Sequence, residues 1–181
     1  MNSVAAKTSI PAKRLPAFDK ETELANAIVE APRGSTYKYK FNPATGLFHL
    51  HKRLPAGAAF PFDFGFIPGT EGEDGDPLDV LLLLEEPAAV GTAVPARLIG
   101  VIEAEQTEGG KTSRNDRLLA VLETPFNPPP YKSLDDLDDQ LLAEIEHFFV
   151  SYNEAEGRVF KPIGRGGPQQ AVLMVKKHLL K

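Results

Sequence analysis

Three aspartates lie close together where a turn precedes an apolar run. Asp74, Asp76 and Asp79 belong to the sequence Asp-Gly-Asp-Pro-Leu-Asp, which continues directly into five apolar residues, 80–84. Asp74 and Asp76 share one face of an extended chain, and the intervening glycine and proline permit a turn that brings Asp79 to the same centre. Carboxylates this close raise one another's pKa unless a cation lies between them. The pattern favours a hard divalent ion with oxygen ligands, such as Mg²⁺, Mn²⁺ or Ca²⁺.

A plain polar turn is the alternative interpretation of this segment, because Asp, Gly and Pro are common turn residues. The position of Asp79 favours the metal, since this third carboxylate directly adjoins the apolar strand. A calcium-binding EF-hand loop fits poorly, because that loop requires a glycine where Asp79 stands and helices on both sides.

A second group of residues is basic. On a chain of net charge −5, residues 33–53 contain no acid and five basic side chains, namely Arg33, Lys38, Lys40, Lys52 and Arg53. Alternation at 37–41 and 47–54, on either side of an Asn-Pro-Ala-Thr-Gly turn, predicts a β-hairpin. If Leu50 and Leu54 face the core, Arg53 faces away from it. The hairpin is therefore a candidate anion site.

Further elements must position these two groups. Strands are predicted at 80–84, 93–103 and 117–122, with a loop at 107–111. Apolar spacing predicts a helix from Ser133 to about Tyr152, and Pro168 opens a second helix. Strands first and helices last predict an α+β fold built on a small closed β-barrel. We expect residues 1–20 to form an N-terminal extension and residues 21–181 a single domain.

Composition excludes several classes of protein. The chain has 181 residues, 42% hydrophobic and 25% charged, without cysteine. These values exclude collagen-like and disordered chains, a disulfide framework and thiolate catalysis. No apolar run approaches the roughly 18 residues of a membrane span. Residues 1–18 lack the apolar core of a secretory signal, so a cytoplasmic protein is expected.

The acidic run resembles the signature of soluble family I inorganic pyrophosphatases, Asp-x-Asp-Pro-x-Asp-Val, and the resemblance extends from about residue 27 to residue 175. It implies an OB-like β-barrel with C-terminal helices packed on it, several bound Mg²⁺ ions and hydrolysis of diphosphate to two phosphates. It further implies that Asp74 and Asp79 bind metal and that Asp76 orients or deprotonates the attacking water.

Other positions match the family pattern one at a time. By this resemblance Glu30 reaches a metal, and the phosphates are bound by Lys38, Arg53, Tyr152 and Arg117. Compact homo-oligomers are also common in the family, so we expect a homo-oligomer.

The chain departs from the family pattern at several positions. Lys40 stands at a usual glutamate, Phe64 at an active-site tyrosine and Asn153 at a lysine. The family's Asp-x-Lys pattern appears as Asn115-Asp116-Arg117, so the metal ligand there is Asn115 or, after a shift of one residue, Asp116. A second acid of this region has no clear counterpart, and the candidates are Glu105 and Glu108 from the preceding loop, residues 105–114.

Three functions follow. The first is Mg²⁺-dependent hydrolysis of inorganic diphosphate, with Mn²⁺ as a possible substitute. The second is a divergent paralogue with weak activity or another phosphate substrate, which the departures favour. The third is an OB-type nucleic-acid binder that uses the basic hairpin with Tyr37, Tyr39 and Phe41 for stacking. The third is disfavoured because it leaves the three aspartates unexplained. No membrane partner is expected.

Overall fold

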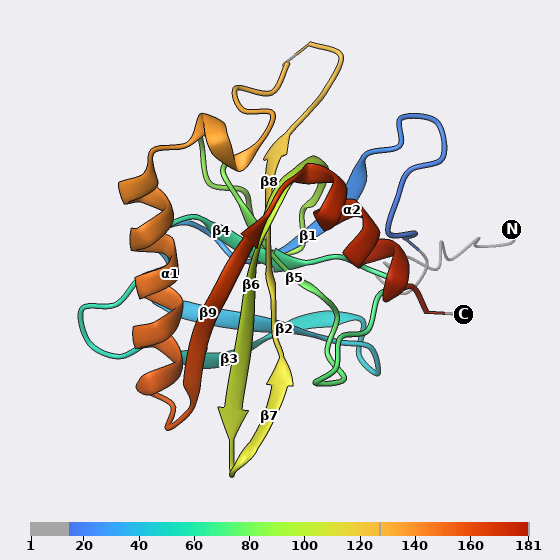
Figure 1. Ribbon diagram of the computed structural model, residues 1–181. Coiled ribbons are helices and arrows are strands. Elements are labelled where there is room, and N and C mark those ends of the chain that lie inside the picture. The colour runs from blue at the N-terminus through green and yellow to red at the C-terminus, as the bar shows by residue number, and fades with distance from the viewer. Residues whose placement is uncertain (1–14, 127, 181) are drawn as a thin grey trace, which may run out of the picture.

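The structure is a computed structural model that describes residues 15–126 and 128–180. Strands dominate its first two thirds and helices lie near its end (Figure 1). In chain order the elements are β1 (Ala25–Ala31), β2 (Tyr37–Asn42), β3 (Leu47–Arg53), β4 (Asp63–Phe66), β5 (Asp79–Leu82), β6 (Ala93–Glu108), β7 (Lys111–Arg114), β8 (Arg117–Leu122), the 3₁₀ turn η1 (Leu134–Asp136), α1 (Asp139–Glu154), β9 (Val159–Gly166) and α2 (Pro168–Lys177). Within these ranges neither helix is long and apolar enough to cross a membrane.

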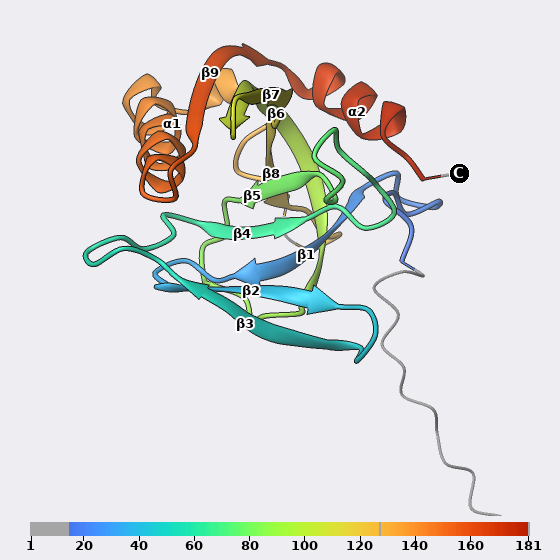
Figure 2. The ribbon, with the colours of Figure 1, turned by 90° about the horizontal axis from the view of Figure 1, so that it is seen from below.

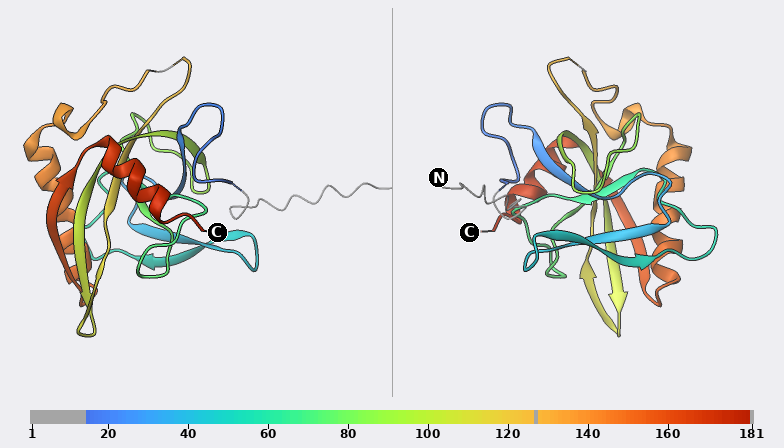
Figure 3. Two further views of the ribbon diagram at one scale, coloured as in Figure 1. Left: turned by 45° about the vertical axis from the view of Figure 1, so that its right-hand side comes forward. Right: turned by 180° about the vertical axis from the view of Figure 1, so that it is seen from behind.

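The main sheet closes on itself. Its order is β1-β4-β5-β8-β6, and β1 also pairs with β6, which returns the sheet to its first strand. β7 and β9 extend β6 beyond this ring, and Figure 3 shows β6 and β7 projecting together from the barrel. The predicted α+β fold, a small closed OB-like barrel with C-terminal helices packed on it, is confirmed.

Strand β5 is buried on both faces. Val80 and Leu82 belong to an apolar cluster that includes Ala171 and Val175 of α2. Leu81 belongs to the opposite cluster, which includes Phe149 of α1. Covering both faces explains why this strand reads as an unbroken apolar run instead of an alternating one.

The predicted first helix begins later than expected. Ser133 caps the short turn η1, with its side chain accepting from the backbone N–H of Asp135 at 3.2 Å. Leu137 is extended, and α1 starts at Asp139 with Asp138 as its N-cap, because the Asp138 carboxylate accepts from the N–H of Gln140 at 2.7 Å. The competing cap divides the helix in two. α2 begins at Pro168, as predicted.

The β2–β3 hairpin forms, but its register differs from simple alternation. Tyr37 lies opposite Arg53 and Lys38 opposite Lys52, whereas Tyr39 lies opposite Leu50. His51 is therefore the extra residue of a β-bulge, which reverses the sides on which the following residues lie. The condition that Leu50 and Leu54 both face the core is met by Leu54, which is buried, but not by Leu50, whose exposed fraction is 58%. Figure 2 shows the hairpin alongside β1, outside the ring.

Two other segments differ from expectation. The loop predicted at 107–111 is a tight turn between β6 and β7, because β6 continues to Glu108. β9 was not predicted, since its glycines and proline interrupt the apolar alternation. The predicted extension, residues 1–20, lies mostly outside the described residues, although Ala17 is buried and Phe18 forms a β-bridge with Ala25.

Gly65 offers a test of the barrel's tight packing. It lies in β4 opposite Val29, and a Cβ added to it would lie 2.0 Å from the carbonyl oxygen of Ile28. We expect Gly65→Ala to lower the free energy of unfolding by about 2 kcal/mol or more, because backbone must move. Gly167→Ala, whose Cβ would meet nothing within 4 Å, is the control and should lose about 1 kcal/mol or less. Urea denaturation measures both, and equal losses would contradict the packing argument.

Candidate active site

The acidic segment forms a tight turn between β4 and β5. The N–H of Asp76 donates to Oδ1 of Asp74 at 3.1 Å, and the N–H of Gly72 donates to the carbonyl of Asp76 at 2.8 Å. Gly75 adopts φ +83°, a conformation that favours glycine. Burial raises the pKa of Asp74, and the charges of Asp79 and Asp76 add to this effect. The turn thus places Asp74 within reach of the charges of Asp76 and Asp79.

Asp76 is bound by a lysine of the hairpin. The Lys40 ammonium lies 2.9 Å from Oδ1 and 3.0 Å from Oδ2 of Asp76. Both side chains are about half exposed. This hydrogen bond raises the pKa of Lys40, with smaller contributions from the Asp76, Glu30 and Asp79 charges. The ammonium is thus a fixed positive charge at the mouth of the acidic turn.

Asp79 pairs with a buried arginine. Because β5 and β8 are parallel with Val80 opposite Leu118, their preceding residues Asp79 and Arg117 come side by side. Nη1 of Arg117 lies 2.8 Å from Oδ2 of Asp79. The guanidinium also lies 5.0 Å from the ring centres of Phe149 and Phe160, a cation–π arrangement that couples α1 and β9 to the site.

Asn115 and Asp116 point to different partners. The Asn115 side chain accepts a hydrogen bond from Arg117 and donates one to Oε1 of Gln106 at 2.9 Å. Asp116 Oδ1 instead accepts from the backbone N–H of Ala104 and from Nη2 of Arg114, both at 2.8 Å. Asn115 is therefore linked through Arg117 to Asp79, while Asp116 is engaged with β6 and β7.

Glu30 and Lys38 face each other beside an aromatic ring. Lys38 Nζ lies 3.8 Å from the Glu30 carboxylate and 4.6 Å from the ring centre of Phe64. Burial raises the pKa of Glu30 to about 7, Lys38 opposes the rise, and Asp79 adds to it. Phe64 itself is buried and supplies only its apolar ring.

A further group of charged side chains lies near the end of α1. The sequence predicted Lys52 and Tyr152 as parts of an anion site, but it gave no signal for Glu156 or Arg158. Lys52 lies 4.5 Å from the ring centre of Tyr152 and forms an ion pair with Glu156, which also pairs with Arg158. Burial lowers the pKa of Lys52 to about 7, with Lys38 and Arg158 adding to the effect. Burial also raises the pKa of Tyr152 well above its usual range, so the phenol stays protonated.

Arg53 lies apart from this group. It is exposed at the end of β3 and, within residues 15–126 and 128–180, takes part in no ion pair. The bulge at His51 places Lys52 instead of Arg53 opposite Lys38. Register pairing with Lys38 is the signal that could have identified Lys52, but a bulge cannot be seen in the alternation alone.

The structure also shows where the remaining residues that differ from the family pattern lie, together with the two candidate acids Glu105 and Glu108. Asn153 is buried, and its side chain donates to the carbonyl of Phe149 at 2.8 Å. The side chain therefore hydrogen-bonds the backbone of α1 one turn earlier. Glu105 pairs in register with Arg114 of β7. Because neighbouring residues of a strand point to opposite faces, Glu105 lies on the other face of β6 from Gln106. Glu108 lies at the exposed end of β6, 4.0 Å from Arg158.

The residue types at the acidic turn are those that bind a divalent ion. Asp74, Asp76 and Asp79 offer the oxygen ligands that Mg²⁺ prefers. Asn115 and Gln106 offer neutral amides that already hydrogen-bond one another. Across the described part of the chain, no three His, Asp or Glu side chains are prearranged to hold an ion. The carboxylates of the acidic turn are therefore suitable ligands for a divalent ion. The amides of Asn115 and Gln106, which bind each other, are poor ligands for a further ion.

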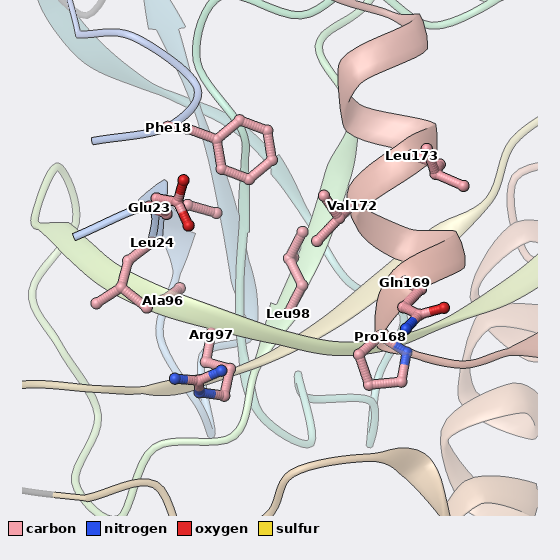
Figure 4. A pocket seen from close by; sticks show the side chains of 11 residues that line it. Phe18, Glu23, Leu24, Ala96, Arg97, Leu98, Pro168, Gln169, Val172 and Leu173 are labelled. Atoms are coloured by element: carbon pink, nitrogen blue, oxygen red, sulfur yellow. The ribbon is translucent and has the colours of Figure 1, made fainter. Parts of the chain in front are cut away.

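A separate hollow of about 430 Å³ lies between the Phe18 segment, β6 and α2. Figure 4 shows it lined mainly by apolar side chains, among them Phe18, Leu98 and Val172, with Glu23 and Arg97 at its edge. It shares no residue with the acidic turn or with the cations of the hairpin. The hollow therefore does not belong to the candidate active site.

The buried carboxyl of Glu30 predicts a dependence of stability on pH. In the unfolded chain it loses its proton near pH 4.5, whereas the folded protein holds the proton until about pH 7. Folding therefore takes up a proton in this window, and stability should fall by about 3 kcal/mol as the pH rises through it. Glu30→Gln should flatten this part of the profile, and the exposed Glu154→Gln should not. Denaturant unfolding in EDTA from pH 4 to pH 8 measures the difference. Parallel profiles for wild type and Glu30→Gln would contradict the prediction.

Comparisons with known proteins agree with this geometry. The family model described as inorganic pyrophosphatase matches residues 27–180. An inorganic pyrophosphatase of Thermus thermophilus is 35% identical over 146 residues, which cover 81% of each chain. That of Corynebacterium efficiens is 42% identical over 128 residues, covering 71% of this chain and 78% of the relative.

Solved structures extend the similarity to the fold. The crystal structure of the Thermus thermophilus inorganic pyrophosphatase has a TM-score of 0.81 at 32% identity, covering 91% of this chain and 94% of that chain. The structure of an inorganic pyrophosphatase from Neisseria gonorrhoeae has a TM-score of 0.81 at 34% identity, covering 92% and 95%. The resemblance inferred from the acidic turn is confirmed, and the chain belongs to the inorganic pyrophosphatase family of diphosphatases.

Proposed function

We propose that this chain hydrolyses inorganic diphosphate to two phosphates at the acidic turn, with Mg²⁺ as the metal and Mn²⁺ as a substitute. The observation that carries the proposal is that the acidic turn faces basic side chains of the hairpin: Lys40 pairs with Asp76, and the charge of Asp79 acts on Lys52. Family membership supports the same reaction.

The basic side chains bind the phosphates. Lys38 and Lys52 lie opposite each other in the hairpin, and Arg158 joins them through Glu156. Their side chains are only 18%, 25% and 22% exposed, which strengthens their attraction for phosphate oxygens compared with fully solvated charges. The protonated phenol of Tyr152 can donate a further hydrogen bond. These groups neutralise the charge that develops on the departing phosphate.

The acidic turn supplies the other half of the reaction. Asp74 and Asp79 would hold the divalent ion, with Glu30 reaching it from β1. When bound, such an ion neutralises phosphate charge and lowers the pKa of water, which gives a nucleophile near neutral pH. Asp76 orients the attacking water and accepts its proton on a carboxylate oxygen. Asn115 and Arg117 hold Asp79 in position through their hydrogen bonds.

A divergent paralogue with weak turnover or another phosphate substrate is the second candidate. The Asn115–Gln106 amide pair and the contact between Lys40 and Asp76 favour it, because both reduce the charge available for metal ions. The nucleic-acid alternative loses support, since Phe41 packs against Phe48 with ring centres 5.3 Å apart. A cytoplasmic location and a homo-oligomer stay predictions.

The proposal is tested by phosphate release from inorganic diphosphate, with and without Mg²⁺. Nucleoside diphosphates and organic diphosphates serve as competing substrates. We expect release to depend on the divalent ion and to be fastest with diphosphate. Faster release from an organic compound would favour the paralogue, and no release from any of them would contradict the proposal.

The hairpin register predicts which cation binds substrate. Lys52→Met should raise the KM for diphosphate about tenfold or more, because a charge-assisted hydrogen bond in a half-buried site is lost. Arg53→Met should change the KM less than twofold, since Arg53 is exposed on the other side of the strand. Steady-state kinetics at saturating Mg²⁺ measure both. If Arg53→Met has the larger effect, Arg53 is the phosphate ligand, as the resemblance to the family predicts.

A further inference from the structure

The charges around the acidic turn nearly cancel without any ion. The acids are Glu30, Asp74, Asp76, Asp79 and Glu156, and each except Asp74 forms an ion pair with a side chain of the chain itself. The basic members are Lys38, Lys40, Lys52, Arg117 and Arg158. A site with this balance can accept an anion with fewer divalent ions than a cluster of unpaired carboxylates requires.

Lys40 differs from the other basic members in where it lies. Arg117 is buried between aromatic rings and Lys38 is mostly covered, whereas the side chain of Lys40 remains 48% exposed. Its ammonium contacts both carboxylate oxygens of Asp76, at 2.9 and 3.0 Å. An ammonium has three N–H donors, so at least one stays available for a ligand that enters from solvent.

The opposite side of the site offers little for an additional ion. Oε1 of Gln106 accepts from Asn115, and Oδ1 of Asn115 accepts from Arg117. Asp116, which immediately precedes β8, is held by the N–H of Ala104 and by Arg114. Both the paired amides and the ion pairs therefore reduce the number of divalent ions that the site is expected to bind.

We propose that Lys40 is a resident cation of this site, whose ammonium group occupies the place beside Asp76 that a divalent ion would fill and binds an oxygen of the diphosphate. The proposal rests on the function proposed above. Its consequence is that the chain binds diphosphate with fewer divalent ions than it would with an acidic residue at position 40.

Calorimetry of metal binding tests the first half of this proposal. Lys40→Glu should bind one more Mg²⁺ per chain than the wild type, or bind Mg²⁺ at least tenfold more tightly, in the absence of diphosphate. Lys176→Glu is the matched control, because it makes the same change of charge at an exposed position of α2. A Lys40→Glu protein that binds Mg²⁺ as the wild type and the control do would overturn the proposal.

Binding of imidodiphosphate, a diphosphate analogue, in EDTA tests the second half. The wild type should bind it without metal, Lys40→Met should weaken binding at least tenfold, and Lys40→Arg should restore it to within about threefold. Absence of wild-type binding, or equal binding by Lys40→Met, would overturn the proposal. Neither measurement needs turnover, so a wild type that releases no phosphate from diphosphate counts against the proposed function while the role of Lys40 is still decided.

Discussion

Burial of β5 on both faces is the constraint on which the site depends. Val80 and Leu82 pack toward α2, and Leu81 packs toward α1, so the strand has no freedom to slide or rotate. A shift of one residue would exchange its two faces. Because the acidic turn leads directly into this strand, the position of Asp79 is fixed by the barrel core, and Asp74 and Asp76 are held by hydrogen bonds that close the turn.

The buried Arg117 transmits this constraint to the other layers of the protein. Its guanidinium forms an ion pair with Asp79 and donates a hydrogen bond to the Asn115 side chain. It also lies over the rings of Phe149 and Phe160. A buried charge that loses its partner is costly, by several kcal/mol. α1, β9 and β8 must therefore keep their places for Asp79 to keep its partner, so Arg117 connects α1 and β9 to the acidic turn.

Charge compensation distinguishes this site from a bare cluster of carboxylates. Asp76 faces Lys40, Asp79 faces Arg117, and Glu30 faces Lys38. Such pairing reduces the negative field that would repel diphosphate. The hairpin supplies two of these cations although it lies outside the closed ring, so its attachment alongside β1 matters for function as well as for stability.

The sequence by itself determined the fold class, the family and the acidic turn, because apolar periodicity and the spacing of Asp74, Asp76 and Asp79 are local properties of the chain. Only the tertiary structure decided which cations face these acids. The bulge at His51 brought Lys52 opposite Lys38, and parallel pairing of β5 with β8 set Arg117 beside Asp79. Register and bulges depend on hydrogen bonds between segments distant in sequence, so no local pattern could specify them.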